Sequence, residues 1–187
     1  MENRFLIGGS GGQGILFMGK LMASAAMVSG KNVTWFPSYG AEIRCGTANC
    51  TVIASDEPIG SPVIKHIDVL IVFNSMSLKK FIHRLRTNGL LFYDSSLFTY
   101  ENGSAEIKTV GIPATTLASE LGSKKSANML MLGAVASITD MLFLKKNVLL
   151  SVMENDSVKL SAETLSLNKL AIARGFEIIE NQKRTGH

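Results

Sequence analysis

Cysteine, proline and charged residues are all scarce in this sequence. Its 187 residues include two cysteines, four prolines and only 18% charged residues, whereas 46% are hydrophobic. One cysteine pair is too few for an iron–sulfur cluster of its own, which is bound by four ligands. Cys45 and Cys50 are five residues apart, so a strand would point them to opposite faces, and we expect neither a disulfide nor a shared metal. Both are interpreted as reduced thiols of a cytoplasmic protein.

Long apolar segments and a strongly charged surface are missing as well. The apolar-rich stretch at 126–139 is too short and too interrupted to span a bilayer, and the polar start predicts no secretory signal. The formal net charge is +4, and basic residues concentrate at helical spacing in one run: Lys79, Lys80, His83, Arg84 and Arg86. Such a run is typical of a solvated helix face, so we expect neither a membrane nor a nucleic acid as a partner.

What the chain does contain is a regular alternation of apolar segments and helical patterns. Strands are predicted at 4–7, 32–36, 47–54, 68–73, 90–93 and 105–110. Helices are predicted at 13–29, 74–88, 113–121, 128–143 and 160–174. The alternation predicts a single α/β domain over residues 1–187, with a three-layer α/β/α arrangement and a largely parallel, Rossmann-like sheet. Residues 180–187 are expected to form a loose tail.

Several helix boundaries follow from individual residues. Asn74 or Ser75 is expected to cap the second helix, which Gly89 would end, and Gly175 would end the last helix. The helix at 128–143 is apolar around most of its circumference. It is therefore expected to be buried in the domain or in a subunit contact.

A glycine-rich loop follows the first predicted strand and leads into the first predicted helix. It consists of Gly8, Gly9, Ser10, Gly11, Gly12, Gln13 and Gly14. Glycines permit positive φ and remove the Cβ atoms that would keep a phosphate away from the backbone amides, and a helix start favours negative charge. The pattern therefore predicts that these seven residues, called the glycine loop below, bind a phosphate-bearing cofactor.

Three interpretations of the glycine loop compete. A dinucleotide site would need an acidic residue at the end of the second strand, but none occurs before Glu42. A P-loop would end in Gly-Lys-Ser or Gly-Lys-Thr, whereas Gly14 is followed by isoleucine. A tight turn that serves packing alone stays open. Gln13, a polar side chain that packing does not require, favours a binding loop.

A second polar segment lies just beyond the second predicted strand, where open α/β sheets bind ligands. Its candidate cofactor-binding residues are Ser38, Tyr39, Glu42, Arg44, Thr47 and Asn49. Arg44 can pair with Glu42 or meet a phosphate or a partner's carboxylate, and an ordinary surface loop with an ion pair is the alternative. A nucleophilic Cys45 would need a base that the sequence does not place. No catalytic residue is assigned.

The two segments are more specific together than apart. Gly-Gly-x-Gly-Gly-Gln-Gly at 8–14 precedes Ser-Tyr-Gly-x-Glu-x-Arg-x-Gly-Thr-Ala-Asn-Cys-Thr-Val at 38–52. Further matching positions are Asn128, Leu132, Gly133, Asn168, Ala171, Gly175 and Phe176. With this order and spacing, residues 4–176 resemble the gamma family of 2-oxoacid:ferredoxin (acceptor) oxidoreductases. Ala41 stands where that family usually has proline, and Cys45 where it usually has glycine.

The resemblance implies a division of labour between chains. The assembly oxidatively decarboxylates a 2-oxoacid, passes the electrons to ferredoxin and transfers the acyl group to coenzyme A. Thiamine diphosphate, Mg²⁺ and the iron–sulfur clusters would belong to partner subunits, named alpha, beta and delta, whereas this chain would contribute assembly and coenzyme A binding. The Ser-Tyr-Gly form of the second segment resembles enzymes for 2-oxoglutarate, favoured narrowly over 2-oxoisovalerate.

Two other classes of function remain open. A self-sufficient nucleotide- or flavin-binding oxidoreductase domain would use the same glycine loop, and a purely structural subunit would bind no ligand. On the favoured interpretation the isolated chain is inactive, and whether it forms a homodimer alone is left undecided by the sequence.

Overall fold

Six strands form one sheet in the computed structural model, which describes residues 2–38, 48–101, 106–139, 141–155 and 160–185. Their order across the sheet is β2 (Asn32–Ser38), β3 (Ala48–Ser55), β1 (Glu2–Gly9), β4 (Ile67–Val72), β5 (Leu85–Asp94) and β6 (Lys108–Ile112). Strands β1, β4, β5 and β6 are parallel, and β3 is antiparallel to both β1 and β2. Five of the six strands therefore share one direction, and the sheet is mixed because β3 opposes them.

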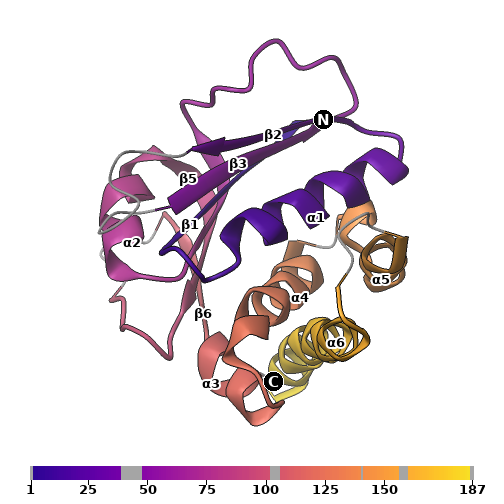
Figure 1. The fold of residues 1–187 in the computed structure, drawn as a ribbon. Coiled ribbons are helices and arrows are strands. Elements are labelled where there is room, and N and C mark those ends of the chain that lie inside the picture. The colour runs from indigo at the N-terminus through magenta and orange to yellow at the C-terminus, as the bar shows by residue number, and fades with distance from the viewer. Residues whose placement is uncertain (1, 39–47, 102–105, 140, 156–159, 186–187) are drawn as a thin grey trace.

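Helices cover the two faces of the sheet unequally (Figure 1). On one face lie α1 (Ile15–Val28), α4 (Ala127–Thr139), α5 (Lys146–Asn155) and α6 (Ala162–Thr185), with α3 (Ala114–Glu120) beside them. On the other face lies α2 (Ser75–Phe81), a short helix. A separate apolar cluster fills each side, the larger one under α1 and α4. The predicted α/β class and its layers are confirmed.

The buried position of α4 confirms another expectation. All ten residues from Ala127 to Ala136 are buried, between the sheet on one side and α6 on the other. The apolar surface of α4 is thus buried within the domain. None of the helices in the described ranges is long and apolar enough to cross a membrane.

The basic run does not form the single long helix that its spacing predicted. Helix α2 ends at Phe81, residues 82–84 form a 3-10 turn, and strand β5 begins at Leu85. Leu85 pairs with Ile67 and its side chain is buried under α2, so sheet pairing and burial outweigh the local periodicity. Gly89, expected to stop a helix, lies inside a strand instead.

Two predicted helix ends are also wrong. Helix α4 ends at Thr139, because residues 142–144 turn so that the ring of Phe143 packs edge-on against Phe5, 6.3 Å between ring centroids. Helix α6 continues through Gly175 to Thr185, so residues 180–185 are helical and not a loose tail. Gly175 does not have the positive φ of a helix-ending glycine, and its missing side chain instead lets α6 approach α4 closely.

Two elements differ from the predicted pattern for local reasons. Helix α5 was not predicted, and its buried side chains, Leu149, Val152 and Met153, face the core beside α1. Strand β2 continues through Pro37, which the sequence placed in a break. A proline is tolerated there because β2 is an edge strand, where ladder hydrogen bonds are needed on one side alone.

Candidate functional site

The glycine loop lies at the carboxyl end of β1, in the middle of the sheet. On one side of β1 are β3 and β2, and on the other are β4, β5 and β6. The chain leaves β1 through α1 toward one side and later returns to β4 on the other. Such a switch point in strand order is where open α/β sheets bind ligands. The strand order thus supports a binding role for the loop, which the glycine content alone could not distinguish from a tight turn.

The glycines of the loop differ in their surroundings, since some are packed against side chains and others face open space. A Cβ at Gly9 would collide with Ile15 and Gln13, and one at Gly14 would collide with the side-chain amide of Asn128, so these two glycines serve packing. A Cβ on Gly11 or Gly12 would meet no atom within 4 Å. Within the described residues, the backbone N–H groups of Gly11 and Gly12 donate to no other group. The tight-turn interpretation therefore explains part of the loop and leaves Gly11 and Gly12, called the tip below, unexplained.

Backbone geometry also requires glycine at two positions of the loop. Gly12 has φ 89° and Gly14 has φ 68°, in the left-handed region that other residues rarely adopt. Gly14 is the cap of α1, and its carbonyl accepts the first bond of that helix from Met18. The tip therefore sits directly at the positive end of a 14-residue helix.

The side chain of Gln13 is used inside the loop. Its Oε1 accepts a hydrogen bond from the backbone N–H of Ser10 at 2.6 Å, and its Nε2 donates to the carbonyl of Phe73 at 3.3 Å. The inference from sequence that packing does not require this amide is therefore wrong, because the amide links the loop to the end of β4.

Two asparagines that the sequence did not place in the site hold the loop from outside. Asn74 caps α2, as predicted, by accepting from the N–H of Ser77 at 2.7 Å, and its Nδ2 donates to Ser10 Oγ at 2.9 Å. Asn128 of α4 donates from Nδ2 to the carbonyl of Gly14 at 2.9 Å. Two sequence signals could have identified these asparagines as site residues: Asn74 directly follows a predicted strand, and Asn128 lies at the start of a predicted helix.

The second polar segment begins and ends beside the glycine loop. Ser38 and Asn49 are cross-strand partners, and Asn49 is also the partner of Gly8 on β1. The structure therefore places Asn49 beside the loop and Ser38 one strand farther away. The other four candidates lie outside the described residues and stay predictions: Tyr39, Glu42, Arg44 and Thr47.

Cysteine chemistry is not supported by the thiol that the structure describes. Cys50 is fully buried on β3, with its Sγ 3.6 Å from the carbonyl of Ile15. Burial raises the pKa of the Cys50 thiol to about 12, and a hydrogen bond with Trp35 offsets this only in part. A thiol with so high a pKa is a poor nucleophile at neutral pH. Cys45 lies outside the described residues.

A pocket of about 240 Å³ adjoins the tip of the glycine loop. Gly12 and Gly14 form one wall, and Lys125 and the hydrogen-bonded pair of Ser126 and Asn168 lie on the others. Lys125 is exposed and adds a positive charge to a pocket that also contains the start of α1. The pocket thus combines free amides, a helix N-terminus and an ammonium group, which together favour an anion.

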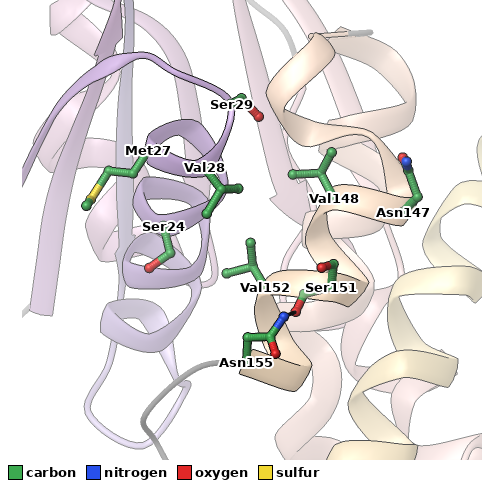
Figure 2. A pocket seen from close by; sticks show the side chains of 9 residues that line it. All are labelled: Ser24, Met27, Val28, Ser29, Asn147, Val148, Ser151, Val152 and Asn155. Atoms are coloured by element: carbon green, nitrogen blue, oxygen red, sulfur yellow. Dashed lines mark hydrogen bonds between the residues drawn. The ribbon is translucent and has the colours of Figure 1, made fainter.

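A larger pocket, of about 540 Å³, lies between α1 and α5 at the far end of α1. Figure 2 shows Val28 of α1 and Val148 and Val152 of α5 pointing into the gap between the helices. None of the described residues that line it has an ionisable side chain. Size therefore favours this pocket, but chemistry favours the smaller one beside the glycine loop, because phosphate recognition needs donors and positive charge.

No metal centre is found in the part of the chain that the structure describes. Groups of three or more histidine, cysteine, aspartate or glutamate side chains that could hold an ion are absent there. Together with the two cysteines of the whole sequence, this donor set does not fit an iron–sulfur cluster.

Known proteins similar to this chain come from one family. The sequence pattern of the family described as "Pyruvate ferredoxin/flavodoxin oxidoreductase" matches residues 4–178. Ketoisovalerate oxidoreductase subunit VorA of Methanothermobacter marburgensis is 39% identical over 137 residues, which are 73% of this chain but 28% of VorA. The chain thus spans less than a third of that relative. The 2-oxoglutarate synthase subunit KorC of Archaeoglobus fulgidus is 33% identical over 138 residues, 73% of this chain and 71% of KorC.

Solved structures agree with the sequence comparisons. The gamma subunit of a keto/oxoacid ferredoxin oxidoreductase from Geobacter sulfurreducens superposes with a TM-score of 0.84 at 26% identity, covering 97% of this chain and 98% of that one. A 2-oxoglutarate:ferredoxin oxidoreductase from Magnetococcus marinus, with 2-oxoglutarate, coenzyme A and succinyl-CoA bound, superposes with a TM-score of 0.85 at 26% identity. There the match covers 96% of this chain and 31% of the other.

Proposed function

Because this chain belongs to the pyruvate ferredoxin/flavodoxin oxidoreductase family, we propose that it is the gamma subunit of a multi-subunit 2-oxoacid:ferredoxin oxidoreductase. The match over 98% of the Geobacter gamma subunit supports this assignment, and in VorA and the Magnetococcus enzyme the matching region is part of a longer chain. The reaction would require partner chains for thiamine diphosphate, Mg²⁺ and iron–sulfur clusters, since the donor set of this chain fits no cluster. Alpha, beta and delta subunits are the proposed partners, with ferredoxin as the acceptor of their electrons.

The part of the reaction that we assign to this chain is the binding of coenzyme A at the glycine loop. The observation that carries this assignment is the open tip, where Gly11 and Gly12 face free space with unused N–H groups. A pyrophosphate or phosphate at the tip would accept these hydrogen bonds at the positive end of α1, with Lys125 within the adjoining pocket. Coenzyme A bound in the Magnetococcus relative supports this choice of ligand.

The 2-oxoacid itself is proposed from the relatives. KorC supports 2-oxoglutarate, and VorA, the more identical of the two relatives described above, supports 2-oxoisovalerate. We expect 2-oxoglutarate first, as the second polar segment predicts. Assay of the complete complex with both acids decides between them, and kcat/KM for each is the quantity to compare.

A nucleotide- or flavin-binding oxidoreductase acting alone has less support. The described end of β2 has Phe36, Pro37 and Ser38, so no carboxylate is available there to bind a ribose. Titration of the chain with coenzyme A, NAD and FMN separates the two proposals. The purified single chain is expected to oxidise no 2-oxoacid when thiamine diphosphate and an artificial electron acceptor are supplied.

The sharpest test of the coenzyme A site is Gly12→Val in the reconstituted complex. A branched side chain at φ 89° disfavours the loop conformation and blocks the approach of a phosphate to the amides. Losing one or two charge-assisted hydrogen bonds would weaken coenzyme A binding by about 2–5 kcal/mol, while decarboxylation at the thiamine continues.

Gly30→Val is the matched control for this variant. Gly30 has φ 78° and also faces open space, but it lies at the opposite end of α1. Both variants carry similar backbone strain, so a loss of stability common to both is separated from a loss of coenzyme A binding. If the Gly12→Val complex assembles and binds coenzyme A as the wild type does, the loop serves packing alone.

A further inference from the structure

Ser10, just before Gly11 and Gly12, forms hydrogen bonds inside the protein through its N–H, its carbonyl and its Oγ. Its N–H donates to Gln13 Oε1 at 2.6 Å, its carbonyl accepts from the N–H of Gln13 at 3.2 Å, and its Oγ accepts from Asn74 Nδ2 at 2.9 Å. Ser10 and Gln13 therefore bind each other reciprocally, much as a capping box does at a helix start. The backbone N–H groups of Ser10 and Gln13 are therefore both used, unlike those of Gly11 and Gly12.

The second half of the Gln13 amide reaches a different element. Phe73 follows β4, its N–H donates to the carbonyl of Gly8 at 2.9 Å, and its own carbonyl accepts from Gln13 Nε2 at 3.3 Å. The amide thus bridges two neighbouring strand ends that are 60 residues apart in sequence. It needs one acceptor and one donor atom for this, which an amide has and an ionised carboxylate does not.

We infer that Gln13 is a positioning residue, which sets the tip of the glycine loop before any ligand arrives and does not itself touch the ligand. This inference rests on the proposed function of the loop. The N–H of Ser10 donates to Gln13 and the N–H of Gln13 donates to Ser10, so the N–H groups of Gly11 and Gly12 between them are left for an anion. Asn74 and Asn128 hold the two ends of this segment through Ser10 Oγ and the Gly14 carbonyl. A loop that is already ordered spares the ligand the entropic cost of ordering a glycine-rich segment.

The test compares Gln13→Leu, which removes both hydrogen bonds of the amide, with Gln13→Glu, which keeps the acceptor for Ser10 and loses the donor to Phe73. Gln182→Leu is the matched control, because Gln182 is an exposed glutamine near the end of α6, far from the loop in sequence. The backbone amide resonances of Ser10, Gly11 and Gly12 are measured in the full ligand-free chain, and the dissociation constant of coenzyme A is measured in the reconstituted complex.

The inference predicts that Gln13→Leu shifts and broadens the three amide resonances without ligand, that Gln13→Glu does so less, and that Gln182→Leu does not. Coenzyme A binding should weaken about tenfold in Gln13→Leu, as expected for one or two lost hydrogen bonds. Unchanged resonances together with weakened binding would mean direct contact with the ligand and would overturn the inference.

Two further outcomes are also decisive. Shifted resonances with wild-type affinity would show that the bridge does not prepare the loop for coenzyme A, which also overturns the inference. If the wild type binds no coenzyme A, the proposed function fails, while the resonances of the free chain still report whether Gln13 orders the tip. Should Gln13→Leu not fold, the Gln13→Glu chain supplies the same measurements.

Discussion

The tip of the glycine loop and the crossing of α4 with α6 both depend on glycine, for opposite reasons. At the crossing, a Cβ on Gly133 would collide with the carbonyl of Ile172, and one on Gly175 would lie 2.7 Å from the N atom of Ala134. At the tip, a Cβ on Gly11 or Gly12 would meet nothing within 4 Å. The first pair lets two backbones approach, and the second pair leaves backbone groups accessible.

This comparison predicts which glycines matter for stability and which for the proposed binding. A close helix crossing is filled by the protein itself, so any added atom must displace backbone. At the open tip an added atom meets no neighbour, so a substitution at Gly11, where φ is not positive, should cost little stability. Substitutions at the two places should therefore separate the free energy of unfolding from the affinity for coenzyme A.

The largest effect is expected from a charge placed inside α4, beside the crossing. Val135 is fully buried, so Val135→Asp would bring an unpaired carboxylate into an apolar setting and lower the free energy of unfolding by about 3–5 kcal/mol. Urea denaturation measures the change. Val63→Asp is the control, because Val63 is 68% exposed and its substitution should cost no more than about 0.5 kcal/mol. Equal stability of the two variants would contradict the described packing.

A smaller loss is expected for Gly175→Ala. The new methyl group would meet the backbone of α4 at Leu130 and Ala134, which cannot rotate away, so about 3 kcal/mol of stability is lost. Gly60→Ala is the control, since a Cβ at Gly60 meets nothing within 4 Å and Gly60 does not have positive φ. Thermal unfolding of both variants checks the prediction. A wild-type melting temperature for Gly175→Ala would mean that the helices cross farther apart.

Gly14→Ala tests the packed end of the glycine loop itself. Positive φ disfavours alanine by about 1–2 kcal/mol, and the methyl group would press on the side-chain amide of Asn128. We expect a loss of about 2 kcal/mol in urea denaturation. Gly14→Ala in an Asn128→Ala background should lose less than in the wild type, because the collision is removed. If the stability losses of Gly14→Ala and Asn128→Ala are purely additive, the loss at Gly14 comes from backbone strain alone and not from the collision.

The smallest effect on stability is expected at the open tip. Gly11→Ala should change the free energy of unfolding by no more than about 0.5 kcal/mol, because the methyl group meets no neighbour and φ is not positive there. Coenzyme A binding in the complex should nevertheless weaken, since the methyl group occupies the path of the phosphate. Calorimetric titration measures this. A Gly11→Ala variant that is stable and binds coenzyme A as the wild type does would show that coenzyme A does not bind at the tip.

Residues of the candidate site differ in how far the sequence could predict them. The glycine loop was found because strand, glycines and helix are consecutive, so local pattern and site coincide. Asn74 and Asn128 were missed as members of the site because they are 64 and 114 residues away from Ser10 and Gly14, their loop partners. Gln13 was found for the wrong reason, since nothing in the local pattern shows that its amide reaches Phe73.

The sequence by itself determined the α/β class, the strand–loop–helix unit and the family, because period, glycine spacing and motif order are properties of consecutive residues. Only the tertiary structure decided that β3 runs against its neighbours, that Gly175 continues a helix, and that Gly11 and Gly12 stay open while Gly9 and Gly14 are packed. The physical reason is that a glycine permits both a turn and a close approach. Which of the two it serves depends on the atoms that distant segments bring beside it.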